Sequence, residues 1–425
     1  MAAVHVAPEI APSTSVAVPA TPAGSATVLP VALRPVRGSG VGTSRAAASG
    51  IETLTAMAAQ SSAELKRFMS SQLANVDALL AAPPAAPAVG RWWQDLGADQ
   101  RAALTHAAPR VVGNLDGIPF QTRNEANRRE LSDAVAQLKK RLRSATTAGE
   151  ESELESESAL LAQVNAAVTP RVGGATRYLV QLDPADGGRA AIAIGNPDTA
   201  DFVTYLVPGL NYGVRDQLVN WAATAEDVYE EERSVLRATR FQTDRLPTVS
   251  VIAWIGYQTP DLFTVGGLER AENGAILLER AWQGLSVARG AHQPYLNVIG
   301  HSYGSTVALV ALASGAVRAD SLILVGSPGS PAQSVEELAV PARTVFVGEA
   351  DWDPAANSAF FGSDPGSAAF GANRLGVSGS RDAVSGRWLN GSIGHNAYFT
   401  VGSESLHNMA LVGTNNANLV TGRSE

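Results

Sequence analysis

A chain of 425 residues with 45% hydrophobic and 17% charged residues has room for one large domain and an accessory region. Its net charge of −8 offers no basic field for phosphate backbones, so nucleic acid is not an expected partner. The absence of cysteine excludes disulfides, thiolate metal sites and a cysteine nucleophile. These values are typical of a folded enzyme or binding protein.

Residues 1–45 are rich in Ala, Pro, Val, Ser and Thr and show no sustained hydrophobic period, which predicts a disordered arm. Pro12, Pro19 and Pro22 interrupt the stretch where a signal peptide needs an apolar helix, and no run approaches the ~18 apolar residues of a membrane span. We therefore expect no transmembrane segment and a cytoplasmic location by default. An export route without a signal would leave the sequence unchanged.

Residues 46–168 have a helical pattern. Leu131, Val135, Leu138 and Leu142 recur at spacings of three and four, which gives a helix with one apolar stripe. The prolines at 83, 84 and 87 separate an earlier helix from a later one, and the acidic run over 150–157 is typical of a solvated helix start. The apolar stripe needs a partner surface, so we expect these helices to pack on the following domain, with a place near the entrance of its active site.

From residue 169 to 425 the pattern alternates between strands and amphipathic helices, which predicts an α/β domain with a mostly parallel sheet covered on both faces. The expected strands share a richness in β-branched residues: 178–182, 190–194, 202–207, 248–255, 296–299, 321–325 and 344–347. Expected helices include 214–240, a helix across 268–285, 305–313 and 403–412.

The pentapeptide Gly300-His301-Ser302-Tyr303-Gly304 lies between an expected strand and an expected helix. A G-x-S-x-G sequence at a strand-to-helix turn is typical of the nucleophile turn of α/β-hydrolases, where glycines remove side chains that would collide with neighbouring backbone. This placement predicts Ser302 as a nucleophile. We expect His301 to pack as a structural residue, with its side chain turned away from that of Ser302.

A serine hydroxyl needs a general base, and in this fold the chain order is Ser, then Asp or Glu, then His. Only His395 and His407 follow Ser302 with an acid between. His395 lies in a glycine-rich loop, whereas His407 lies in the expected closing helix, so the pattern favours His395. For the acid, both Asp351 and Asp353 follow the strand at 344–347, and spacing alone favours Asp351.

The oxyanion of an acyl intermediate needs two backbone N–H donors, one of them from the residue after the nucleophile. Tyr303 supplies that one, and either Leu210 or Asn211 is expected to supply the second, after the strand at 202–207. Gly209 would let this backbone approach the substrate closely. The sequence contains no metal-binding or dinucleotide-binding signature, so we expect chemistry without a cofactor or a metal.

Further short motifs along residues 90–400 complete a family pattern: Trp92-Trp93 and Leu96, 113–119, Arg123 with 126–128, 195–201, Pro208-Gly209, 326–329, Asp364-Pro365, 370–372 and Gly394-His395. In these motifs the chain resembles the actinobacterial branch of the α/β-hydrolase superfamily that is known as a domain of unknown function. The resemblance implies the hydrolase fold and a Ser/Asp/His triad. It favours Asp353 over Asp351, because an Asp-Pro pair recurs at this point. If neither of these two is the acid, Asp364 and Asp382 are the next candidates. Gly209-Leu210-Asn211 departs from the small polar pair expected there.

The combined pattern predicts a serine hydrolase that cleaves an ester or related acyl compound through an acyl-enzyme, with a small-molecule or lipid-like acyl substrate. Two alternatives use the same fold. One is a binding or scaffold protein without turnover, and the other is an acyltransferase in which the acceptor is not water.

Overall fold

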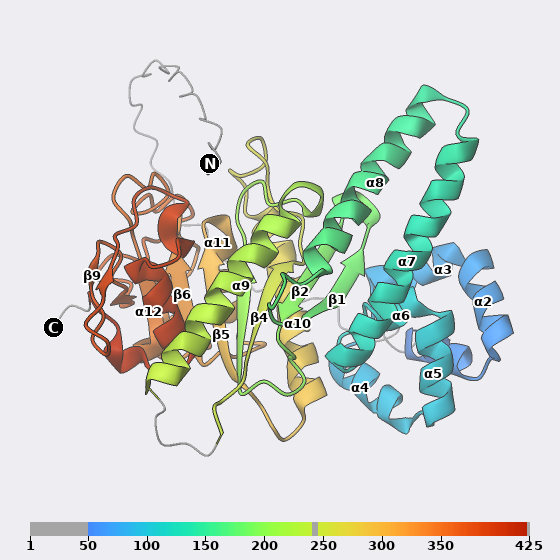
Figure 1. Cartoon of the computed structure of the whole chain (residues 1–425), viewed down its shortest axis with the longest axis horizontal. Coiled ribbons are helices and arrows are strands. Elements are labelled where there is room, and N and C mark those ends of the chain that lie inside the picture. Colours follow the sequence, from blue (N-terminus) through green and yellow to red (C-terminus); the bar gives the residue numbers. More distant parts are fainter. Residues whose placement is uncertain (1–49, 240–244, 423–425) are drawn as a thin grey trace, which may run out of the picture.

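The computed structural model describes residues 50–239 and 245–422. The expected arm at 1–45 lies outside these residues. An eight-stranded sheet has the order β1-β2-β4-β3-β5-β6-β7-β8, in which β2 is antiparallel to both neighbours and all strands from β4 to β8 are parallel (Figure 1). The expected α/β class and mostly parallel sheet are therefore confirmed.

Buried, β-branched segments form the strands, and each of the seven expected runs is one of them. Their bounds are β1 Arg177–Asp183, β2 Arg189–Ile194, β3 Phe202–Val207, β4 Val249–Ile255, β5 Tyr295–His301, β6 Ser321–Val325 and β7 Val345–Gly348. The sequence pattern missed β8 (Asn373–Arg374) and the hairpin of β9 (Ser380–Arg381) and β10 (Trp388–Leu389). Two-residue strands are too short to show a period of two.

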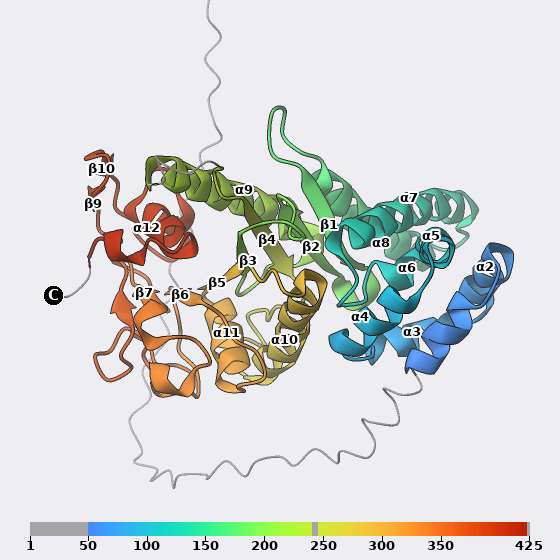
Figure 2. The same cartoon turned by 90° about the horizontal axis from the view of Figure 1, so that it is seen from below.

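Helices cover both faces of the sheet, as a parallel sheet requires. Helices α9 (Val214–Thr239) and α12 (Glu404–Gly413) lie on one face, and α10 (Glu269–Arg289) and α11 (Tyr303–Ala313) lie on the other (Figure 2). Successive residues of β4 serve the two faces: Val251 belongs to the core under α9, and Ile252 to the core under α10. None of the helices within the described ranges is both long and apolar enough to cross a membrane.

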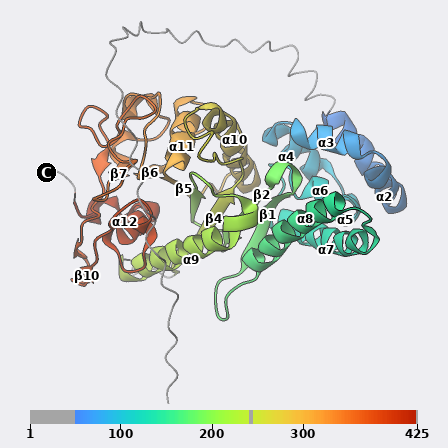
Figure 3. The same ribbon diagram turned by 90° about the horizontal axis from the view of Figure 1, so that it is seen from above.

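A helical region precedes the sheet and stands at its β1 end (Figures 1 and 3). After a helical stretch over 50–58, its helices are α2 Ser62–Ser71, α3 Leu73–Ala81, α4 Ala86–Asp95, α5 Ala98–Ala107, α6 Pro109–Val112, α7 Phe120–Ser144 and α8 Ala148–Val168. They pack on the sheet region, as expected, but not near Ser302, because β2, β4 and β3 separate β1 from β5. Helices α7 and α8 share one hydrophobic core with the sheet.

Strand β1 is an edge strand, and side chains from the helical region bind the backbone groups of its outer edge. Asn114 donates from Nδ2 to the carbonyl of Leu182 at 2.7 Å, and its Oδ1 accepts from the N–H of Leu182 at 3.0 Å. This bidentate pair reproduces the hydrogen bonds of a neighbouring strand. An exposed edge would invite pairing with another chain, so the helical region protects it.

Helix α7 continues this contact along the same edge. The N–H of Leu179 donates to Asn124 Oδ1 at 2.9 Å, and Asn127 Nδ2 donates to the carbonyl of Leu179 at 3.0 Å. One turn further, Arg128 donates to the carbonyl of Arg177 at 2.8 Å. The motifs at 113–119 and 126–128 thus contribute side chains that attach the helical region to β1.

Candidate active site

Ser302 occupies the sharp turn between β5 and α11, with a φ of 56° and a ψ of −133°. A left-handed φ is strained for a residue with a side chain, and such strain concentrates at functional sites. The two glycines of the motif are needed for close packing. A Cβ at Gly300 would lie 2.6 Å from Cα of Ser305, and one at Gly304 would lie 2.3 Å from the carbonyl oxygen of Val207. The expected strand-to-helix turn is therefore confirmed.

His395 is hydrogen-bonded to Asp353, with 2.8 Å between Nδ1 and Oδ1. The Asp353 side chain has no exposed surface, whereas 26% of the His395 side chain is exposed. The second carboxylate oxygen of Asp353 accepts from the hydroxyl of Tyr398 at 2.6 Å, and the N–H of Ala355 donates to the first at 2.9 Å. The imidazole is therefore held in one orientation, with Nδ1–H directed at the carboxylate.

Burial of Asp353 by itself raises the pKa of its carboxyl group, but hydrogen bonds from His395, Tyr398 and Ala355 outweigh it and lower the pKa to about 2. Burial also raises the pKa of Tyr398 well above its usual range, so its hydroxyl stays a donor to the carboxylate. Asp353 is thus a permanent anion beside His395. An anion there stabilises the imidazolium that forms when His395 accepts a proton.

Asp351, which spacing favours as the acid, is not the partner of His395. Its side chain is exposed, and its backbone carbonyl accepts from the N–H of Gly394 at 2.7 Å. The intervening Trp352 has a φ of 63°, a turn that directs Asp353 inward and leaves Asp351 in solvent. Asp351 therefore contributes to the placement of the His395 loop through its backbone.

Ser302 and His395 meet the same segment at the end of β6. The N–H of Ser302 donates to the carbonyl of Val325 at 3.0 Å, and a Cβ at the next residue, Gly326, would lie 3.0 Å from His395 Nδ1. Within the described ranges no hydrogen bond joins Ser302 Oγ to His395. Such bonds are often long without substrate and shorten in the Michaelis complex.

His301 has a larger part in the site than its predicted structural role. It is buried, its Nε2–H donates to the backbone carbonyl of His395 at 2.8 Å, and the two rings lie 4.8 Å apart. Burial, together with the adjacent His395 ring, lowers the pKa of His301 to about 4, so the ring is neutral at physiological pH. His301 therefore positions His395. The sequence showed the histidine but gave no signal of this contact, and Tyr398 carried no signal at all.

The loop after β3 lies against the nucleophile turn. A Cβ at Gly209 would lie 2.6 Å from Cβ of Ser302 and 2.9 Å from the nitrogen of Tyr303, so only glycine fits there. The N–H of Asn211 donates to the carbonyl of Pro260 at 2.9 Å and is already used. In the part of the chain that the structure describes, the N–H groups of Leu210 and Tyr303 have no hydrogen-bond partner. Of the two expected second donors, Leu210 is the one whose N–H is free.

The other candidate acids and the second histidine are engaged elsewhere. His407, in α12, lies between Glu231 at 2.7 Å and Asp382 at 3.2 Å. Asp364 accepts from the N–H of Gly366 at 2.9 Å, as a loop cap does. Across residues 50–239 and 245–422 no group of three His, Asp or Glu side chains is arranged to hold a metal.

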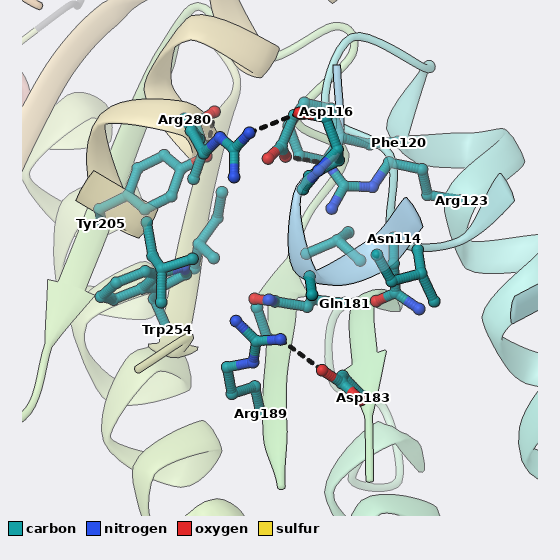
Figure 4. A pocket seen from close by; sticks show the side chains of 18 residues that line it. Asn114, Asp116, Phe120, Arg123, Gln181, Asp183, Arg189, Tyr205, Trp254 and Arg280 are labelled. Carbon is teal, nitrogen blue, oxygen red and sulfur yellow. Dashed lines mark hydrogen bonds and ion pairs between the residues drawn. The ribbon is translucent and has the colours of Figure 1, made fainter. Parts of the chain in front are cut away.

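A cavity of about 60 Å³ lies between the helical region and the sheet (Figure 4). Its charged side chains are largely paired with one another: Arg123 binds Asp116 at 2.9 Å, and Arg189 binds Asp183. Neither Ser302 nor His395 lines it. This cavity belongs to the attachment of the helical region and is separate from the candidate active site.

Comparison with known proteins places residues 183–363 in a family described as Alpha/beta hydrolase. An uncharacterized protein of Mycobacterium tuberculosis is 32% identical over 294 residues, which cover 63% of this chain and 43% of that protein. One from Mycobacterium bovis is 32% identical over 172 residues, which cover 40% of this chain and 64% of that protein. The chain thus spans less than two thirds of the length of these curated relatives.

Among solved structures, a dienelactone hydrolase from Anabaena variabilis is similar at 13% identity and a TM-score of 0.33, covering 56% of this chain and 95% of that one. The family match begins in β1 and ends beyond β7, so it includes the Ser302 turn and Asp353 but not His395. With the strand order of the sheet and the serine at its strand-to-helix turn, the match leads to one conclusion: the chain has the α/β-hydrolase fold, and its residues 183–363 are similar to the Alpha/beta hydrolase family.

Proposed function

We propose that this protein is a carboxylic ester hydrolase in which Ser302 is the nucleophile, His395 the general base and Asp353 the acid of a triad. The observation that carries the proposal is the 2.8 Å hydrogen bond between His395 and the buried Asp353, on a loop next to the strained Ser302. The combination supplies the nucleophile, base and orienting anion that acyl transfer requires.

In the proposed reaction Ser302 Oγ attacks the acyl carbon while its proton passes to His395 Nε2. The N–H groups of Leu210 and Tyr303 stabilise the oxyanion, and Asp353 stabilises the imidazolium. His395 then gives the proton to the leaving alcohol, and the acyl-enzyme remains. A water molecule then loses a proton to His395 and attacks the acyl carbon, and His395 passes that proton to Ser302 Oγ as the acid leaves, which restores both side chains.

Labelling with a fluorophosphonate probe tests the proposal. We expect one adduct on the peptide that contains Ser302, none in Ser302→Ala, and full labelling in Ser286→Ala, which removes an exposed serine of α10. Heat-denatured protein should not react. A folded wild-type protein that neither reacts with the probe nor hydrolyses p-nitrophenyl acetate would contradict the proposal and favour a binding role for the fold.

A further inference from the structure

The surface around the candidate active site carries an unusual set of apolar side chains. Half of the large hydrophobic residues that are exposed among the described residues lie in three loops of this region: Leu262 and Phe263 after β4, Trp352 and Phe360 after β7, and Ile393 and Val401 in the His395 loop. Because β4 and β7 run parallel, the loops after them emerge at one edge of the sheet, and the bridge between Ile393 and Asp351 joins the His395 loop to the loop after β7. A concentration of exposed apolar groups marks a binding surface.

Two of these side chains flank the base and the acid directly. Trp352 precedes Asp353 and is 89% exposed, and its left-handed φ of 63° is strained for a side chain of that size. Ile393, two residues before His395, is 69% exposed, and its backbone forms a bridge with Asp351. The backbone contacts that place His395 and Asp353 thus also present these two side chains to solvent.

Phe360 is linked to the nucleophile turn by a chain of ring contacts. It is 63% exposed and lies 4.9 Å from Phe361, whose ring lies 5.5 Å from that of Tyr303, the residue after Ser302. The loop of Phe263 is fixed to the same turn, because the hydroxyl of Tyr303 donates to the carbonyl of Gly267 at 2.6 Å. These contacts hold the loops that carry Phe360 and Phe263 against the nucleophile turn.

The charged side chains of the loops around the site are all acidic. The loops 208–213, 256–268, 326–335, 349–372 and 390–403 contain no Lys or Arg, and they contain Asp261, Glu349, Asp351, Asp353 and Asp364. At their borders, Arg374 pairs with Glu349 at 2.6 Å, and Arg270, which lies near Phe263, donates to the side chain of Gln258 and has no carboxylate partner among the described residues. A surface of this kind repels anionic head groups and anionic leaving groups.

On the basis of the proposed function, we infer that the site takes an uncharged ester with a long aliphatic part, which it meets at the surface of a neutral lipid aggregate. Trp352, Phe263 and Phe360 would enter the aggregate, where aromatic side chains are stable at the boundary between water and hydrocarbon. The lack of Lys and Arg in these loops distinguishes this mode from binding to anionic membranes, which depends on clusters of Lys and Arg. The ester then lies beside Ser302.

The test measures binding and turnover separately. Full-length Ser302→Ala protein is sedimented with vesicles of phosphatidylcholine and diacylglycerol, and with vesicles in which phosphatidylglycerol replaces part of the phosphatidylcholine. Adding Phe263→Ser and Trp352→Ser should weaken partitioning into the neutral vesicles at least about tenfold, since each removes a large apolar side chain from the contact. The control is Trp388→Ser, an equally large residue on the β9–β10 hairpin that is 60% exposed.

In the active protein, the ratio of the rate on an emulsion of triolein, an uncharged long-chain ester, to that on p-nitrophenyl acetate should fall at least about tenfold in Phe263→Ser/Trp352→Ser and stay constant in Trp388→Ser. Equal partitioning of the double variant and its parent, or stronger binding to the anionic vesicles, would overturn the inference while ester hydrolysis stands. A wild-type protein inactive on both esters would instead remove the proposed function, and vesicle binding would still decide the docking surface.

Discussion

At the scale of single residues, the turn at Trp352 decides which aspartate faces His395. Asp353→Asn should lower kcat by on the order of 10⁴, as loss of the triad carboxylate does in the chymotrypsin-type enzymes. Its carboxylate is held by three donors and has a pKa of about 2, so the wild-type anion persists throughout the usual assay range. The matched control is Asp351→Asn, whose exposed side chain should change kcat little. Steady-state kinetics on p-nitrophenyl acetate measure both.

Equal small losses in these two variants would mean that the acid lies elsewhere. A loss in both of the size expected for Asp353 alone would mean instead that the loop has lost its conformation, which circular dichroism of the folded variants would reveal.

The sequence could predict part of this candidate site because the proposed nucleophile and base are marked by local pattern and chain order. Ser302 lies in a turn motif, and His395 follows it in a glycine-rich loop. The choice between Asp351 and Asp353 depends on one backbone torsion at Trp352, which spacing does not encode. The hydrogen bond that occupies the Asn211 N–H comes from a loop about 50 residues later, so it too had no local signal.

Glu232 is a buried acid outside the site. It has no exposed surface, its Oε1 accepts from Thr204 at 2.6 Å, and its Oε2 has no partner among the described residues. Burial raises its pKa to about 8, although the hydrogen bond from Thr204 lowers it somewhat. The folded state therefore keeps a proton that the unfolded state loses near pH 4.5. Stability should fall as pH rises from about 4.5 to 8.

Glu232→Gln should remove this dependence, which reaches at most about 1.4 kcal/mol per pH unit for one proton. Denaturant unfolding at several pH values between 5 and 8 measures it. Glu230→Gln, an exposed position on the same helix, should keep the wild-type slope. If wild type and Glu232→Gln show parallel profiles, Glu232 is ionised in the folded protein.

At the scale of elements, side chains of the helical region make the hydrogen bonds to the outer edge of β1 that a neighbouring strand would otherwise make. Asn127→Ala should lower the free energy of unfolding by about 1 to 3 kcal/mol, because the carbonyls of Gly113 and Leu179 lose their common donor. Asn220→Ala, on the exposed side of α9, should change it by less than about 0.5 kcal/mol. Urea unfolding compares the two variants. A loss for Asn127→Ala no larger than for Asn220→Ala would show that water replaces the amide.

The elements themselves were largely predictable because each main strand is a buried, β-branched run. The expected strands at 202–207 and 321–325 agree with β3 and β6 to the residue. Tertiary contacts, by contrast, define β8, which is two residues long and pairs only with β7. Helix α7 begins at Phe120, earlier than its apolar stripe suggests, because Asp198 accepts from the N–H groups of Phe120 and Gln121.

At the scale of the whole molecule, the helical region and the sheet share a core. Leu131, Leu154 and Val164 of α7 and α8 pack in the same cluster as Leu179 of β1 and Ile192 of β2. The fragment 169–425 should therefore be less stable than the full chain and should self-associate through the uncovered β1 edge. Thermal unfolding and size-exclusion chromatography measure the two effects. A monomeric fragment with the melting temperature of the full chain would show that the helices are accessory.

The hydrogen bonds between α7 and β1 also depend on a match between the rise of the helix and the advance of the strand. From Asn124 to Arg128 a helix rises about 6 Å, and from Leu179 to Arg177 a strand advances about 6.6 Å, so the two elements stay in step over one turn. Strand β1 has a bulge between Leu179 and Gln181, and a change of its register by one residue would exchange its buried and outer faces. Side chains of α7 hydrogen-bond to the strand on one side of this bulge, and Asn114 hydrogen-bonds to it on the other. The helical region thereby opposes a change of register in the strand at which the sheet begins.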